Sequence, residues 1–225
     1  MGELGGQELT KPLKGIVFDL DGTLIDSLAV TIDAFNHGIT THGGRKHTPK
    51  EILAHFGPGE GQIFAKILGP EKAASAYEAS RKYTDDHKNK MPLHPGIGEL
   101  LEQLKSSGVP ISIFTGRSWE TTELILKHHR LLDRFVTVVA NDHVSMAKPS
   151  PEGLYLCLER MKLKPDEILF IGDSPSDMIA ARAAKSRGVG ALWDLLATKK
   201  SLEIYQPDHY AERPEEIWEI WKRIR

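Results

Sequence analysis

The chain has 225 residues, a length that suits one core with a modest insertion better than two independent domains. Its 29 lysines and arginines are balanced by 31 aspartates and glutamates, so it lacks the basic excess expected of a general nucleic-acid binder. A composition with 40% hydrophobic and 27% charged residues excludes a wholly disordered chain, and the single cysteine excludes an intramolecular disulfide framework.

Five short, nearly all-apolar runs predict strands that are buried on both faces of a parallel sheet. They are residues 15–18, 111–115, 135–140, 168–172 and 189–193. Between them lie helical patterns at residues 97–104, 121–132, 152–161 and 177–187. Strands that alternate with helices in this way predict an α/β fold with a doubly wound parallel sheet.

One stretch interrupts the alternation. From Ser27 to Met91 the chain carries four helical patterns and no convincing strand, and Pro92 and Pro95 then mark the return to the core. We therefore expect a small α-helical domain at residues 26–92, inserted between two parts of the core at residues 1–25 and 93–225. The last residues, near 215–221, predict an amphipathic helix whose tryptophans pack on the core.

No apolar run approaches the roughly 18 residues of a membrane span, and the first residues contain no apolar stretch of signal-peptide length. The single cysteine is compatible with a reducing compartment. We expect a soluble, cytoplasmic protein without a membrane or nucleic-acid partner. The oligomeric state cannot be read from the sequence, because an exposed apolar patch has the same pattern as a packed core.

Polar residues follow the predicted strands where ligands of open parallel sheets bind, beyond the carboxyl ends. The first strand ends in Asp19 and Asp21, the second in residues 115–117, and the fourth in residues 172–177. Lys148 stands between the third strand and the next helix. Carboxylates, a hydroxyl and an ammonium group are therefore expected at one edge of the sheet.

Several carboxylates beside one lysine require a cation, because like charges this close do not all stay ionised unaided. A hard ion such as Mg²⁺ is the natural candidate, and a carboxylate beside it can attack phosphorus to form an aspartyl phosphate. Helix capping is the competing explanation for these residue types, and we accept it for Ser27 and Ser176. It does not explain the whole set, since a helix needs only one such cap.

These motifs resemble the haloacid dehalogenase superfamily, and within it the phosphoglycolate phosphatase-like and β-phosphoglucomutase-like branch, over residues 15–211. Residues 18–24 match the first motif of that family, Thr115 the second, residues 148–149 the third and residues 172–177 the fourth. The resemblance implies a Rossmann-like core, and it implies that the helical insertion is the cap of that branch.

The resemblance also implies roles for four carboxylates. Asp19 would be the nucleophile and a Mg²⁺ ligand, and Asp21 the general acid and base, binding the ion through its backbone carbonyl. Asp173 would be a direct ligand, with Asp177 supporting the water shell of the ion. Family members that break carbon–halogen bonds lack the second aspartate, so its presence argues against dehalogenation.

By the same resemblance, Thr115, Gly116 and Lys148 would bind the phosphate, and Lys148 would also steady the nucleophile. Many sugar-phosphate members carry serine or asparagine after the threonine, whereas here Gly116 offers only its backbone amide. Arg117 is a candidate for substrate binding, and its alternative is a solvated arginine at a helix start.

The loop at residues 57–61 is a candidate for substrate selection. Glu60 within it and His55 just before it are candidate specificity residues. A plain connection between helices would explain its glycines equally well.

The leading hypothesis is a Mg²⁺-dependent phosphatase that acts on a small phosphorylated metabolite through an aspartyl-phosphate intermediate. A phosphomutase of the β-phosphoglucomutase type is the alternative, since the same core residues serve both reactions. A non-catalytic binding module is a weaker alternative, because fold alone does not prove function. Phosphoglycolate, a sugar phosphate, a nucleotide and pyrophosphate all remain open as substrates.

Overall fold

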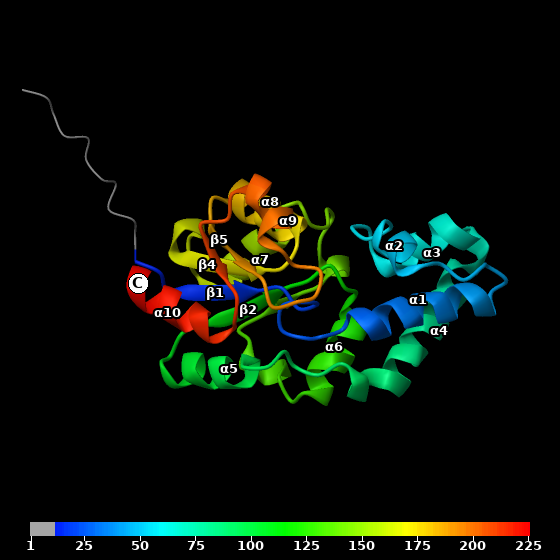
Figure 1. The fold of residues 1–225 in the computed structure, drawn as a ribbon, viewed down its shortest axis with the longest axis horizontal. Helices are drawn as coiled ribbons and strands as arrows, with labels where there is room; N and C mark the ends of the chain where they lie inside the picture. The colour runs from blue at the N-terminus through cyan, green and yellow to red at the C-terminus, as the bar shows by residue number, and fades with distance from the viewer. Residues whose placement is uncertain (1–11) are drawn as a thin grey trace, which may run out of the picture.

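The computed structural model of the chain describes residues 12–225. The first 11 residues, which belong to the first predicted core segment, lie outside the described part. A six-stranded parallel sheet forms the core, in the order β3-β2-β1-β4-β5-β6 (Figure 1). The strands are β1 Gly15–Phe18, β2 Ile111–Phe114, β3 Val138–Val139, β4 Ile168–Gly172, β5 Arg187–Ala191 and β6 His209–Ala211.

Strand β1 lies in the interior of the sheet, between β2 and β4. Its four residues are all buried, and successive side chains face opposite sides: Ile16 packs into one apolar cluster and Val17 into the other. The strand order runs outward from β1 in both directions. Its carboxyl end is therefore a switch point, where an open parallel sheet forms its binding crevice.

Helices cover both faces of the sheet, as Figure 1 shows. On one face, apolar residues of α5 (Ile97–Ser106), α6 (Trp119–His128) and α10 (Glu215–Ile224) join the larger core cluster. On the other, α7 (Glu152–Met161) and α8 (Pro175–Ala184) supply the second cluster. A short helix, α9 (Lys199–Leu202), lies beside α8. The arrangement confirms the predicted doubly wound α/β core and the packing role of the last helix.

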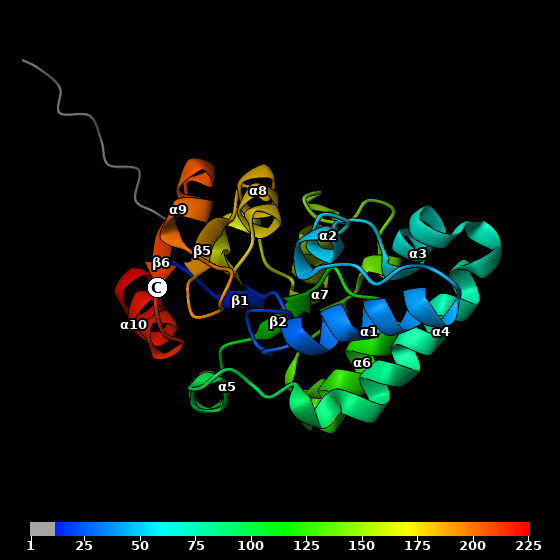
Figure 2. The same cartoon turned by 45° about the vertical axis from the view of Figure 1, so that its right-hand side comes forward.

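Four helices form a cap beside the carboxyl ends of the strands (Figures 1 and 2). They are α1 Leu28–Thr41, α2 Pro49–Leu53, α3 Glu60–Leu68 and α4 Pro70–His87. The cap has its own apolar cluster, which includes Phe35, Ile52 and Phe64 and is separate from both core clusters. An inserted helical cap is thereby confirmed, while its boundaries at residues 26 and 92 stay a prediction.

Two segments of chain connect the cap to the core, and they are hydrogen-bonded to each other. The amide of Asp26 donates to the carbonyl of Pro92 at 2.9 Å, and the amide of His94 donates to the carbonyl of Leu24 at 3.0 Å. Residues 25 and 93 form an isolated antiparallel bridge between them. The connection is therefore a hydrogen-bonded pair of segments rather than two separate linkers.

The largest differences from the predicted elements lie toward the edges of the sheet. The third strand has two residues instead of six, and the predicted 189–193 strand begins two residues earlier, at Arg187. The glycines in Arg187–Ala191 hide its start from an apolar pattern. The short edge strand β6 was not predicted, since only Ala211 of its three residues is buried. Five 3-10 turns complete the described elements: Lys88–Lys90, Leu132–Arg134, Asn141–His143, Pro165–Glu167 and Glu203–Tyr205.

None of the helices in the described range is both long and apolar enough to cross a membrane. The cytoplasmic location stays a prediction.

Candidate active site

The sheet itself places the candidate residues at its carboxyl edge. Asp19 follows β1, and its amide donates to the carbonyl of Ile171 in β4 at 2.8 Å. Thr115 follows β2, and its amide donates to the carbonyl of Val139 at 2.9 Å. Asp173 comes directly after β4. The strand ladders thus continue one residue past β1 and β2 and hold these backbones in place.

Lys148 binds two carboxylates at once. Its Nζ donates to Asp19 Oδ1 at 2.5 Å, to Asp177 Oδ1 at 2.7 Å and to the carbonyl of Phe114 at 3.3 Å, and all three charged side chains are buried. Burial alone would lower the pKa of the ammonium, but the attraction of the two carboxylates raises it above its ordinary value. Lys148 is therefore a fixed positive charge beside Asp19.

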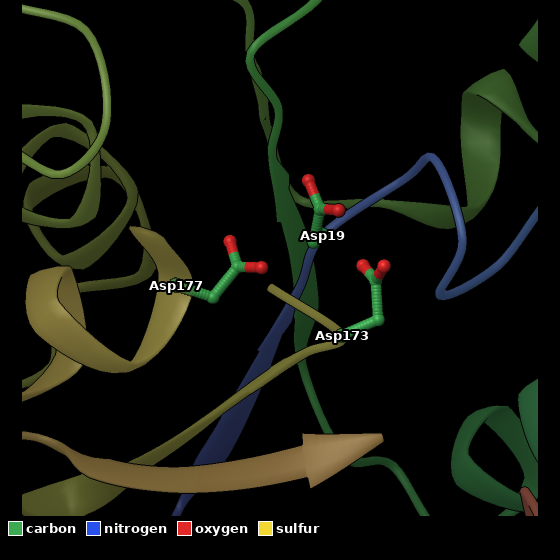
Figure 3. A group of neighbouring side chains, drawn as sticks. All are labelled: Asp19, Asp173 and Asp177. Atoms are coloured by element: carbon green, nitrogen blue, oxygen red, sulfur yellow. The ribbon is translucent and has the colours of Figure 1, made fainter. Parts of the chain in front are cut away.

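Asp19, Asp173 and Asp177 bring carboxylate oxygens to within 4.8 Å of one another. Figure 3 shows the three carboxyl groups gathered around one small region. Burial, with the charge of Asp177 adding to it, raises the pKa of Asp19 to about 7 although Lys148 opposes the rise. Burial and the neighbouring carboxylates also raise the pKa of Asp173 well above its ordinary value. Lys148 does not balance the negative charge of the three carboxylates. Their oxygens are ligands that a hard divalent cation prefers.

The two oxygens of Asp177 are already used. Oδ1 accepts from Lys148, and Oδ2 accepts from the amide of Ser174 at 3.0 Å and from its hydroxyl at 2.6 Å. Among residues 12–225, the side chain of Asp173 accepts one longer hydrogen bond, from the hydroxyl of Thr23 at 3.2 Å. Asp19 and Asp173 are therefore better placed to bind an ion directly, and Asp177 to support the site from the side.

Gly22 allows this close arrangement. Its φ of +78° is a conformation that residues with a side chain rarely adopt. A Cβ at this position would lie 2.5 Å from Oδ2 of Asp173. The glycine after Asp21 is therefore required both by the turn and by the neighbouring carboxylate.

Asp21 is held by Arg117. The Arg117 Nε donates to Oδ2 at 3.0 Å and to Oδ1 at 3.2 Å, Nη2 donates to Oδ1 at 2.5 Å, and the hydroxyl of Ser27 also donates to Oδ1 at 2.5 Å. Burial acts to raise the pKa of Asp21, but the guanidinium charge and its hydrogen bonds hold it below the ordinary value. The Arg117 side chain is only 4% exposed, so its alternative interpretation as a solvated arginine is wrong.

The candidate specificity residues behave differently from one another. Glu60, at the start of α3, accepts hydrogen bonds from the amide of Ser118 at 3.2 Å and from its hydroxyl at 2.5 Å, and it lies 3.6 Å from Nη1 of Arg117. His55 takes no part in this network, and its buried Nδ1 has no hydrogen-bond partner among the described residues. The structure thus brings Glu60 and Arg117 together but leaves His55 apart.

Thr115 and Gly116, two of the phosphate-binding candidates, directly follow β2. Thr115 is fully buried, and its hydroxyl oxygen accepts from the amide of Arg117 at 3.1 Å. Gly116 is exposed, with nothing within 4 Å of the place a Cβ would occupy. The roles of these residues in binding stay predictions.

The sequence does not reveal the polar side chains that hold the candidate site residues in place. Ser27 precedes α1, but the capping role that its position predicts is wrong: its side chain makes no cap bond and donates to Asp21 instead. Thr31 accepts from Nη2 of Arg117 at 2.8 Å, and Ser118 binds Glu60. Thr31 carries no signal in the sequence, because a threonine on a helix is usually unremarkable.

The fold and the site together define a capped α/β enzyme with acidic chemistry at the switch point of its sheet. The family model described as haloacid dehalogenase-like hydrolase matches residues 16–191, and the chain belongs to this family. This confirms the predicted family and the prediction of an enzyme of the phosphoric monoester hydrolase class.

Known relatives cover nearly the whole chain. The pyrophosphatase PpaX of Bacillus mycoides is 30% identical over 210 residues, which is 93% of this chain and 97% of the relative. A solved haloacid dehalogenase-like hydrolase from Streptococcus pneumoniae is 28% identical with a TM-score of 0.76, covering 93% of this chain and 98% of that one. A predicted phosphoglycolate phosphatase from Haemophilus somnus shares the fold, with 23% identity, a TM-score of 0.81, and coverage of 92% and 97%.

Proposed function

We propose that the chain is a Mg²⁺-dependent phosphatase that hydrolyses a small phosphorylated metabolite through an aspartyl phosphate on Asp19. The observation that carries the proposal is the contact between Asp19 and Lys148. Lys148 binds one oxygen of the carboxylate, and among the described residues no side chain donates to the other oxygen. A buried carboxylate oriented in this way, with one oxygen available, is suited to nucleophilic attack.

In the first step, an oxygen of Asp19 forms a bond to phosphorus while the bond to the leaving group breaks. The leaving oxygen takes a proton from the protonated form of Asp21. Although burial acts to raise the pKa of this carboxyl group, Arg117 lowers it, which makes the protonated form the minor one in this structure. In the second step, water attacks the same phosphorus and gives a proton to Asp21. The bond between phosphorus and Asp19 breaks, and phosphate is released. Lys148 and Thr115 bind the phosphoryl oxygens through both steps, one by charge and one by hydrogen bonding.

Asp19, Asp173 and the backbone carbonyl of Asp21 would hold the Mg²⁺ ion, with Asp177 supporting the site. The support for this assignment is the set of hard oxygen donors and the raised pKa values of Asp19 and Asp173. When bound, the ion supplies positive charge that offsets the charge of the substrate phosphate.

The cap would exclude bulk water and select the leaving group. Pyrophosphate heads the list of substrates to test, because the curated relatives are named as pyrophosphatases. Phosphoglycolate, sugar phosphates and nucleotides complete the panel, and glucose 1-phosphate with a bisphosphate primer tests for mutase activity. Turnover of none of these with Mg²⁺ present would count against the proposal.

The mechanism is tested by trapping the phosphorylated protein. The full chain is mixed with Mg²⁺ and p-nitrophenyl phosphate, quenched rapidly and analysed by mass spectrometry. An Asp21→Asn variant should accumulate a phosphoryl adduct on the peptide that contains Asp19, because an activated substrate needs little protonation while water still needs a base. Asp19→Asn should form none, and the exposed Asp133→Asn should behave as wild type. An adduct on serine or histidine would refute the assignment of the nucleophile.

A further inference from the structure

Arg117 joins the core to the cap. The residue itself belongs to the loop after β2, and its guanidinium contacts three side chains from different parts of the fold. Nε and Nη2 bind Asp21 in the core, Nη2 also donates to Thr31 of α1 at 2.8 Å, and Nη1 lies 3.6 Å from Glu60 of α3. Two of the three partners therefore come from the cap, and the side chain is almost fully enclosed between them.

Glu60 has a second attachment to the core. Its carboxylate accepts from the amide and the hydroxyl of Ser118, the residue that precedes helix α6. Tyr77 of the cap helix α4 reaches the same hydroxyl at 2.7 Å. These contacts dock the cap on the two residues that follow Gly116, at the edge of the candidate active site.

Charge makes the three groups depend on one another. Asp21 and Glu60 are two carboxylates on either side of one guanidinium, and without that positive charge they would repel each other across the boundary between core and cap. If the cap moves away, Arg117 loses Thr31 and Glu60, and its fork has Asp21 alone to fix its position.

We propose that Arg117 is a positioning residue that orients the Asp21 carboxylate when the cap is docked, and that Glu60 is the cap residue that fixes this docked position. The part played by Asp21 rests on the proposed function. Arg117 then serves the reaction without touching the substrate, which differs from the substrate-binding role expected from the sequence. The arrangement ties the position of the acid–base group to closure of the site.

Whether the contact between Arg117 and Asp21 depends on the docked cap can be tested without an activity assay. The measurement is NMR hydrogen exchange of the arginine Nε–H groups in the labelled full chain. The Nε–H of Arg117 should exchange slowly in wild type, because it is buried and bonded to Asp21. Glu60→Ala should speed its exchange by about 10-fold or more, through more frequent opening of the contact. Unchanged exchange in Glu60→Ala would overturn the proposal.

Glu120→Ala is the matched control. Glu120 is an exposed carboxylate on α6 that lies 3.8 Å from Arg81 of the cap, so its replacement also removes a charged contact between core and cap. It does not contact Arg117 in the described structure, and the exchange of the Arg117 Nε–H should stay at the wild-type rate. An equal acceleration in this variant would show that any loss of interface charge has the effect, and would overturn the part assigned to Glu60.

Kinetics with p-nitrophenyl phosphate and Mg²⁺ test the positioning role. Arg117→Met should lower kcat by about 10-fold or more while KM changes by less than about threefold, since the substrate contacts are kept. Combined with Asp21→Asn, the same change should lower kcat by less than about twofold, because residues that act through one group are not additive. A loss confined to KM, or an equal loss in both backgrounds, would overturn the proposal.

Arg117→Lys tests whether the loss of activity in Arg117→Met comes only from poor folding. Lysine keeps the charge but not the three-nitrogen fork, and it should recover only part of the lost kcat. Full recovery would show that charge alone is needed and would overturn the positioning role. A wild-type chain that turns over no phosphorylated substrate would refute the proposed function. An active wild type whose Arg117 variants keep the wild-type kcat would refute this inference alone.

Discussion

Replacing Asp19 with asparagine should make the folded chain more stable in metal-free buffer at about pH 8, although it removes the proposed nucleophile. The unfolded chain releases the Asp19 proton near pH 3.8, whereas the folded chain keeps it until about pH 7. The folded state therefore binds more protons between these values, and the contribution of Asp19 to stability falls as the pH rises through that window.

The size of the effect follows from the shift in pKa. At about 1.4 kcal/mol per pKa unit, a rise from 3.8 to about 7 corresponds to at most about 4 kcal/mol of destabilisation above pH 7. Asp19 is 5% exposed, so solvent screening removes little of it. Asparagine carries no charge yet keeps an oxygen that accepts from Lys148. The variant should match wild type near pH 4 and exceed it at pH 8.

The assay is chemical denaturation of both proteins at several pH values, in a chelator and again with excess Mg²⁺. Mg²⁺ should stabilise wild type by binding its folded state, and should stabilise the variant less. Asp21→Asn is the control with the opposite sign: although burial acts to raise the pKa of Asp21, Arg117 holds it low, so its replacement should destabilise the fold at neutral pH. An Asp19→Asn variant no more stable than wild type at pH 8 without metal would refute this reasoning.

Three further outcomes are expected. Asp173→Asn should raise the Mg²⁺ concentration needed for half-maximal activity, because a hard cation loses an anionic ligand, and an unchanged value in a Mg²⁺ titration would exclude Asp173 as a ligand. Gly22→Ala should also raise the Mg²⁺ concentration needed for half-maximal activity and cost about 1–2 kcal/mol of stability, because its Cβ would meet Asp173 and its backbone is left-handed; the same titration and a urea melt check both effects. Gly153→Ala should destabilise the fold by about 1–3 kcal/mol without changing Mg²⁺ dependence, because its Cβ would lie 2.1 Å from the ring of Phe114; a urea midpoint equal to that of wild type would contradict this.

The sequence predicted best the elements whose signal is local. Strands β1 and β4 and helix α7 have the predicted boundaries, because each is an apolar pattern bounded by turn residues. Edge strands were predicted poorly, since a strand with one neighbour needs less apolar character. The glycines of β5 had a similar effect, because they remove side chains from the pattern.

The candidate site also has a part that the sequence predicts and a part that it does not. Asp19, Lys148, Asp173 and Asp177 could be placed together, because parallel strands bring their carboxyl ends to one edge. The contact between Asp21 and Arg117 spans 96 positions and depends on the direction of a flexible side chain. No periodicity or motif encodes that direction. The sequence therefore allowed both a solvated and a substrate-binding interpretation of Arg117.

The position of β1 within the sheet also affects the order of events during synthesis. The first strand leaves the ribosome before both of its neighbours, β2 and β4, which begin at Ile111 and Ile168. The cap helices emerge in the meantime and have their own apolar cluster, so they can pack while β1 still has no partner. An all-apolar strand that must wait for partners so distant in sequence slows folding and is open to pairing with other chains. Between translation of β1 and of β4, the nascent chain therefore carries a buried strand that lacks at least one of its neighbours in the sheet.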